Sequence, residues 1–114
     1  KYEPERYFKV IKMCKLEKDL GDLTSGDETE IGENGVVLSN GQKQRVALAR
    51  TIYSKHEILI IDDFLSAVDL QITKSIYKQF WTSELTINRT IILVTHCKDF
   101  CHDAYMTVYI KDGQ

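Results

Sequence analysis

Three segments of the chain have the spacing or the composition of helices. Residues 4 to about 20 place their apolar side chains near one face, and Pro4 suits the first position of a helix. Residues 38 to about 54 are rich in strong helix formers, and Ser39 is a good residue to cap their N-terminus. Residues 69 to about 81 carry apolar side chains at helical spacing. The pattern therefore predicts three helices.

Three shorter segments are continuous apolar runs of strand length, at residues 58–61, 90–95 and 106–110. The first run is rich in β-branched residues, which is typical of a strand buried on both faces of a parallel sheet. The other two runs predict further buried strands, the last of them ending in a turn at 112–113. Residues 21–35 are rich in Gly, Asp, Glu, Ser and Thr, which predicts a loop.

Polar residues suited to phosphate chemistry stand at the ends of these predicted elements. The helix that follows Ser39 presents unpaired N–H groups and the positive end of its dipole, where phosphates bind readily. Gly41 permits the close approach of a backbone or a ligand. Asp62 and Asp63 follow the first strand, at the place where open α/β sheets bind ligands. One such carboxylate can hold Mg²⁺ through water and substrate phosphates, and the second can orient or deprotonate an attacking water.

Each of these features alone has an ordinary structural explanation. A glycine after Ser39 and Asn40 suits a turn, and two acids after a strand suit a solvated loop. A lone histidine such as His96, which follows the second apolar run, suits the surface or a hydrogen-bonded place in the core. The order of the features is more specific than any one of them, because all four occur on the expected kinds of element.

Four motifs follow one another: LSNGQ at 38–42, a strand ending in two acids at 62–63, SAVD at 66–69, and His96. Their order and spacing resemble the signature, Walker B strand, D-loop and switch histidine of the ATP-binding cassette (ABC) nucleotide-binding domain. The opening helix, the Gly-Glu-x-Gly loop, Asp63 and the Gln-Lys-x-Arg after the signature point to a subfamily. They resemble the first nucleotide-binding domain of multidrug-resistance-associated-protein (C subfamily) transporters.

The resemblance implies an α/β fold, that of a P-loop NTPase-like ABC ATPase domain, present here in part. Residues 1–54 would form part of the helical subdomain with the signature helix, and residues 55–114 the Walker B side of the ATPase core. No G-x-x-x-x-G-K-[S/T] occurs, so the chain is expected to be a fragment whose Walker A half is absent. The loop at 30–35 would lie near the cytoplasmic ends of membrane helices, or be a plain acidic surface loop.

The resemblance also assigns nucleotide contacts. Ser39, Asn40, Gly41 and Gln42 would cap the phosphates of an ATP molecule held by the P-loop of a second nucleotide-binding domain. Asp69 would lie in the D-loop, between the two domains of a head-to-tail dimer. Asn40 stands where the family has its first signature glycine, and Asn tolerates unusual backbone angles better than most residues.

The acids and the histidine would act on the ATP held by this domain's own P-loop. Asp62 would join the Mg²⁺ shell, Asp63 would replace the catalytic glutamate, and His96 would hydrogen-bond the γ-phosphate. Asp63 is one methylene shorter than glutamate, and a displacement of ~1 Å can cost roughly 100-fold in rate. Phe64 also replaces a proline that often follows, so these departures weigh against fast hydrolysis at this site.

The function implied by the resemblance is ATP binding and hydrolysis, with Mg²⁺, to drive transmembrane transport. The partners would be a second nucleotide-binding domain and the transmembrane domains of the transporter. The domain would lie at the cytosolic face of a membrane. Without a P-loop, the chain alone is expected to bind ATP weakly and not to turn it over.

Three alternatives stay open. The first is a regulatory cassette with little hydrolysis, which Asn40, Asp63 and Phe64 favour and which Asp62 and His96 oppose. The second is a soluble ABC ATPase of translation or DNA maintenance, which the lack of coiled-coil heptads and of a basic patch disfavours. The third is a truncated product without activity, for which the missing P-loop is the only support.

Composition narrows these possibilities. The 114 residues allow one domain, and the net charge of -2 argues against a nucleic-acid partner. No apolar run approaches membrane-spanning length, and no signal peptide is evident. Three cysteines, an odd number, favour a reducing compartment. Cys97 and Cys101 adjoin histidines, but no second ligand cluster supports zinc, and Cys14 is expected in the core.

Overall fold

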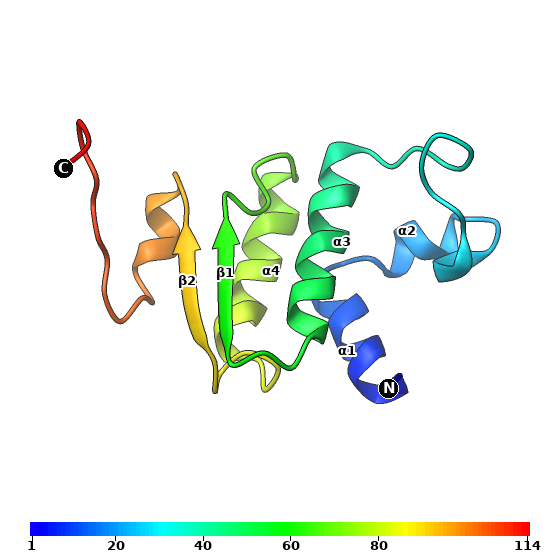
Figure 1. The fold of residues 1–114 in the computed structure, drawn as a ribbon, viewed down its shortest axis with the longest axis horizontal. Coiled ribbons are helices and arrows are strands. Elements are labelled where there is room, and N and C mark those ends of the chain that lie inside the picture. Colours follow the sequence, from blue (N-terminus) through cyan, green and yellow to red (C-terminus); the bar gives the residue numbers. More distant parts are fainter.

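The computed structural model describes residues 1–114 as four α-helices, two strands and two 3₁₀ turns (Figure 1). In chain order these elements are α1 (Pro4–Met13), α2 (Glu17–Gly21), η1 (Gly26–Glu28), α3 (Asn40–Tyr53), β1 (Ile58–Asp62), α4 (Leu70–Thr82), β2 (Thr90–Val94) and η2 (Lys98–Cys101). The α/β fold predicted from the sequence is therefore confirmed. No helix is long and apolar enough to span a bilayer.

The predicted helix over residues 4–20 is broken into α1 and α2, so its single-helix form was wrong. Lys15 has a φ of 54°, in the left-handed region, which ends the first helix. The turn lets both Cys14 and Leu16 enter the core, where an unbroken helix would direct two residues two positions apart to different faces. Burial of Cys14, predicted from its neighbours, is confirmed, and it raises the pKa of the thiol to about 12.

β1 and β2 pair in parallel, with Ile58 opposite Thr90 and Asp62 opposite Val94, and α4 forms the crossover between them. One face of β1 carries Leu59 and Ile61 into a core that it shares with α1, α3 and α4. The parallel register brings the carboxyl ends of both strands to the same edge, which Figure 1 shows at the upper side of the molecule.

The prediction that these strands are buried on both faces was wrong for this chain. Ile58, Ile60, Ile92 and Val94 alternate with the core residues and lie exposed, Ile60 at 72%. The helices of this chain cover one face of the sheet only, so the second apolar set faces outward.

The third strand predicted at 106–110 does not form. Four of its residues are more than 70% exposed: Met106, Val108, Tyr109 and Ile110. The segment runs in extended form apart from β2 (Figure 1). An apolar, β-branched segment becomes a strand only when another strand pairs with its backbone, and no such ladder adjoins it here.

The C-terminus of α3 is held by α1. The Arg6 guanidinium donates to the carbonyl oxygens of Ile52, Tyr53 and Ser54 at 2.8–2.9 Å. The last carbonyls of a helix lack partners within the helix, and a cation there also interacts favourably with the helix dipole. This contact fixes α3, whose other end carries the signature motif.

Candidate nucleotide-contact site

The signature motif forms the N-terminus of α3 through a capping box. The Ser39 hydroxyl accepts from the backbone N–H of Gln42, and the Gln42 side-chain oxygen accepts from the backbone N–H of Ser39 at 2.8 Å. The backbone N–H groups of Asn40 and Gly41 make no hydrogen bond within the chain. Ser39 and Asn40 are exposed, so this helix end offers two free donors and a dipole to an anion.

The close approach allowed by Gly41 is made by another segment of this chain. A Cβ at position 41 would lie 2.7 Å from the carbonyl oxygen of Ala67, in the predicted D-loop. The Gln44 carboxamide adds two bonds there: it donates to the Ser66 hydroxyl at 2.9 Å and accepts from the Ala67 N–H at 2.8 Å. The signature helix and the segment 66–69 are thus joined directly.

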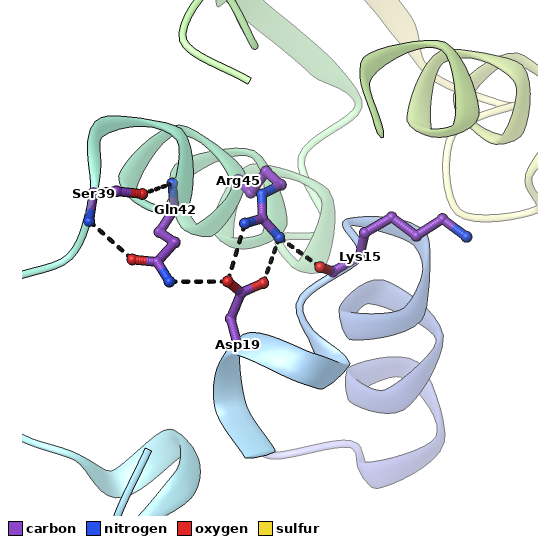
Figure 2. Close-up of polar contacts among 5 residues, drawn as sticks. All are labelled: Lys15, Asp19, Ser39, Gln42 and Arg45. Atoms are coloured by element: carbon purple, nitrogen blue, oxygen red, sulfur yellow. Dashed lines mark hydrogen bonds and ion pairs between the residues drawn. The ribbon is translucent and has the colours of Figure 1, made fainter. Parts of the chain in front are cut away.

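The opposite side of the signature helix is joined to α2 through Asp19 (Figure 2). The Asp19 carboxylate accepts from the Gln42 amide at 2.9 Å and from both terminal nitrogens of Arg45, at 2.6 and 3.1 Å. Arg45 is buried and also donates to the carbonyl oxygen of Lys15. The hydrogen bonds from Arg45 hold the pKa of Asp19 below its usual value, so the carboxylate is charged at neutral pH.

The predicted acids lie at the carboxyl end of β1. Asp62 is the last residue of the strand, and Asp63 follows in a left-handed conformation with a φ of 44°. The backbone N–H of Asp63 donates to the carbonyl oxygen of Val94, the last residue of β2. His96 follows two residues later and is exposed, as are both acids. The strand pairing therefore brings the acids and the histidine to neighbouring strand ends.

Asp69 has a structural task in this chain. Its carboxylate caps α4 by accepting from the backbone N–H groups of Gln71 and Ile72. The predicted helix start at this residue is confirmed, while its contact with nucleotide stays a prediction.

Two groups of predicted site residues emerge. Ser39, Asn40, Gly41 and Gln42 adjoin the segment 66–69. Asp62 and Asp63 adjoin the end of β2 that leads to His96. Both groups lie at the same end of the elements that carry them, the N-terminus of α3 and the carboxyl ends of the strands (Figure 1).

The acid pair fits a loosely held Mg²⁺ better than a metal held by protein alone. The side chains of Asp62 and Asp63 form no hydrogen bond or ion pair within the chain, so both carboxylates are available. No group of three or more His, Cys, Asp or Glu residues is arranged to hold an ion. Mg²⁺ bound to substrate phosphates needs only one or two carboxylates.

Sequence reasoning missed Asp19 and Gln44. Gln44 is two residues from Gln42 on a helix, so the two carboxamides point to different neighbours, and only the fold reveals which. Arg45 offered a signal, because it shares the apolar face of α3 with the buried Leu48 and Ile52. A charged residue on such a face indicates a buried partner, and Arg45 does form an ion pair with Asp19.

Comparison with known proteins decides the family. A model of the ABC transporter family matches residues 6–66, more than half of the chain. This chain belongs to the ABC transporter family. It is 50% identical over 113 residues to ATP-binding cassette transporter abc4 of Schizosaccharomyces pombe, covering 98% of this chain and 8% of that protein.

Further relatives support the subfamily predicted from the sequence. The ABC transporter ATP-binding protein/permease VMR1 of Saccharomyces cerevisiae is 46% identical, covering 99% of this chain and 7% of the relative. Human ATP-binding cassette sub-family C member 4 is 44% identical, covering 100% of this chain and 8% of the relative. The C-subfamily resemblance is confirmed, and this ABC chain spans less than a tenth of the length of these relatives. Membership implies an ATP-binding domain.

Proposed function

We propose that this chain is the signature and Walker B part of a nucleotide-binding domain that hydrolyses ATP to drive transmembrane transport. Residues 1–54 would belong to the helical subdomain and residues 55–114 to the ATPase core. The parent protein would be a C-subfamily transporter, with this domain at the cytosolic face of the membrane. The outward apolar face of β1 and β2 would pack against the part of the domain that carries the Walker A loop.

The observation that carries the proposal is the arrangement of free polar groups at one end of the fold. The N-terminus of α3 presents two unpaired N–H groups beside an exposed Ser39. Asp62, Asp63 and His96 are exposed at the strand ends. Phosphoryl transfer needs such groups to position phosphates, water and metal and to neutralise charge.

Each group would act on a different ATP molecule. The segment 39–42 would donate to the phosphates of ATP held by a second nucleotide-binding domain, in a head-to-tail dimer. Asp69 would lie between the two domains. For ATP in this domain, Asp62 would hold Mg²⁺ through water, and the ion when bound would offset phosphate charge. Asp63 would orient the attacking water and His96 would hydrogen-bond the γ-phosphate.

A regulatory cassette with little hydrolysis is the second candidate. The specific observation that favours it is Asp63, whose side chain is one methylene shorter than that of glutamate. Its backbone is in the left-handed region, and the residue that follows it, Phe64, is buried. The same fold would then bind ATP to gate a channel or a partner.

ATPase measurements on the complete protein separate the two candidates. We expect Asp63→Asn to lower kcat about 10-fold or more, because it removes the carboxylate that orients water. We expect Asp63→Glu to hold or raise kcat, because the longer side chain reaches the water better. Asp112→Asn, which alters an exposed acid whose side chain makes no hydrogen bond or ion pair, is the control and should leave kcat unchanged. Equal rates in both Asp63 variants would reject hydrolysis through Asp63 and favour the regulatory cassette.

A further inference from the structure

Both the oxygen and the nitrogen of the Gln42 carboxamide are hydrogen-bonded within the chain. Its oxygen accepts from the backbone N–H of Ser39, and its nitrogen donates to Asp19. The Gln42 backbone N–H is bonded to the Ser39 hydroxyl. Both ends of the carboxamide therefore serve the geometry of the helix start, one toward the signature serine and one toward α2 (Figure 2).

Asp19 is the fixed point of this arrangement. The Asp19 side chain is 23% exposed. The Arg45 side chain, which is 9% exposed, donates a hydrogen bond to each of the two Asp19 carboxylate oxygens. Arg45 also holds the carbonyl oxygen of Lys15, which precedes α2. A carboxylate held by two charge-assisted bonds has little freedom, so the bond it accepts from Gln42 has a defined direction.

We propose that Asp19 is a positioning residue for the signature segment, acting through the Gln42 carboxamide. The chain of contacts runs from Asp19 to Gln42 and on to the Ser39 backbone. It sets the orientation of the carboxamide that closes the capping box, and with it the direction of the Ser39 hydroxyl and the free N–H groups of Asn40 and Gly41. The inference rests on the proposed function, in which this segment contacts the phosphates of ATP held by a second nucleotide-binding domain.

The contact has a mechanical consequence. α2 and the turn at Lys15 connect to α1, while α3 carries the signature at its N-terminus. A displacement of α2 would therefore reach the signature segment through the bond between Asp19 and Gln42. Small misplacements of groups that contact a reacting phosphate have large effects on rate.

The test is a double-mutant cycle in the complete transporter with ATPase activity as the readout. Its members are the wild type, Asp19→Asn, Gln42→Ala and the double variant. Asp19→Asn is isosteric, so it keeps the packing while it weakens the grip on Gln42 and Arg45. We expect it to lower kcat about 10-fold and to change KM for ATP less than about 2-fold, since the P-loop of the partner supplies most nucleotide affinity.

The cycle distinguishes positioning from simple stabilisation. If Asp19 acts through Gln42, adding Asp19→Asn to Gln42→Ala lowers kcat less than about 2-fold further. If Asp19 only stabilises the fold through Arg45, the fold decreases in kcat of the two single variants multiply in the double variant. That result would overturn the proposal. Asp22→Asn is the matched control: Asp22 is exposed three residues further on, and its side chain makes no hydrogen bond. It should leave kcat and KM unchanged.

Two further measurements, the melting temperature of each variant and the ATPase activity of the wild type, distinguish the possible outcomes. The melting temperature of each variant is measured, and a variant with a low kcat and an unchanged KM at a temperature well below its melting point has lost positioning, not folding. A wild-type protein without ATPase activity would reject the proposed function and this inference with it. An active wild type with multiplying losses would reject the inference alone.

Discussion

At the scale of single residues, Gly41 shows how a glycine can be required by its own chain. Nothing larger than hydrogen fits, because a Cβ would lie 2.7 Å from the carbonyl oxygen of Ala67, a backbone atom that cannot rotate away. The sequence indicated a close approach at this position, but it left open whether a ligand or a backbone makes it. The structure shows that the D-loop backbone does.

We expect Gly41→Ala to destabilise the intact nucleotide-binding domain by about 1–3 kcal/mol, as is usual when an atom is forced into a filled space. Gly21→Ala is the control, because a Cβ at position 21 meets nothing within 4 Å and alanine favours a helix. The measurement is urea unfolding of both variants. Equal stability of the two would contradict the close packing of α3 on the D-loop.

At the scale of elements, α3 is held at four places. Arg6 contacts its C-terminus, Asp19 and the segment 66–69 contact it near its N-terminus, and its apolar face packs into the core. The Gln44 contacts join it to the segment 66–69, which precedes α4. The two segments proposed to reach the partner domain are therefore joined to each other directly.

We expect Gln44→Ala to free the D-loop without unfolding the domain. The Ala67 amide donates to Gln44, so its hydrogen exchange should accelerate about 5-fold or more when a bond of about 1 kcal/mol is lost. Lys43→Ala is the control, since Lys43 is exposed and its side chain has no partner. Unchanged exchange at Ala67 would show that the D-loop is held by other contacts.

The elements themselves were largely predictable from local chemistry. Local residues predicted the start of α3 at its capping serine and the start of α4 at Asp69. The apolar runs of single strands predicted β1 and β2. The break at Lys15 could not be predicted, because the gain comes from burying Cys14 and Leu16 in the tertiary core.

At the scale of the whole molecule, predictions failed where they depended on neighbours. The segment 106–110 has the composition of a strand but no strand beside it, and the apolar runs at β1 and β2 are covered on one face. The same limit applies to the site. Residue types and order predicted the family, whereas Asp19 and Gln44 lie outside the motifs or act through contacts between distant segments.

The central claim is that the signature segment of this chain serves ATP held by a second nucleotide-binding domain. The most direct measurement is cross-linking in the complete protein, with Ser39→Cys paired with a cysteine in the P-loop of the second domain. The half-exposed Cys97 and Cys101 are first replaced by serine, while buried Cys14 stays. With a mild thiol oxidant added to take up the two electrons, we expect a disulfide between the two domains that forms only in the presence of ATP. A cross-link that forms equally without nucleotide, or none with it, would contradict the account.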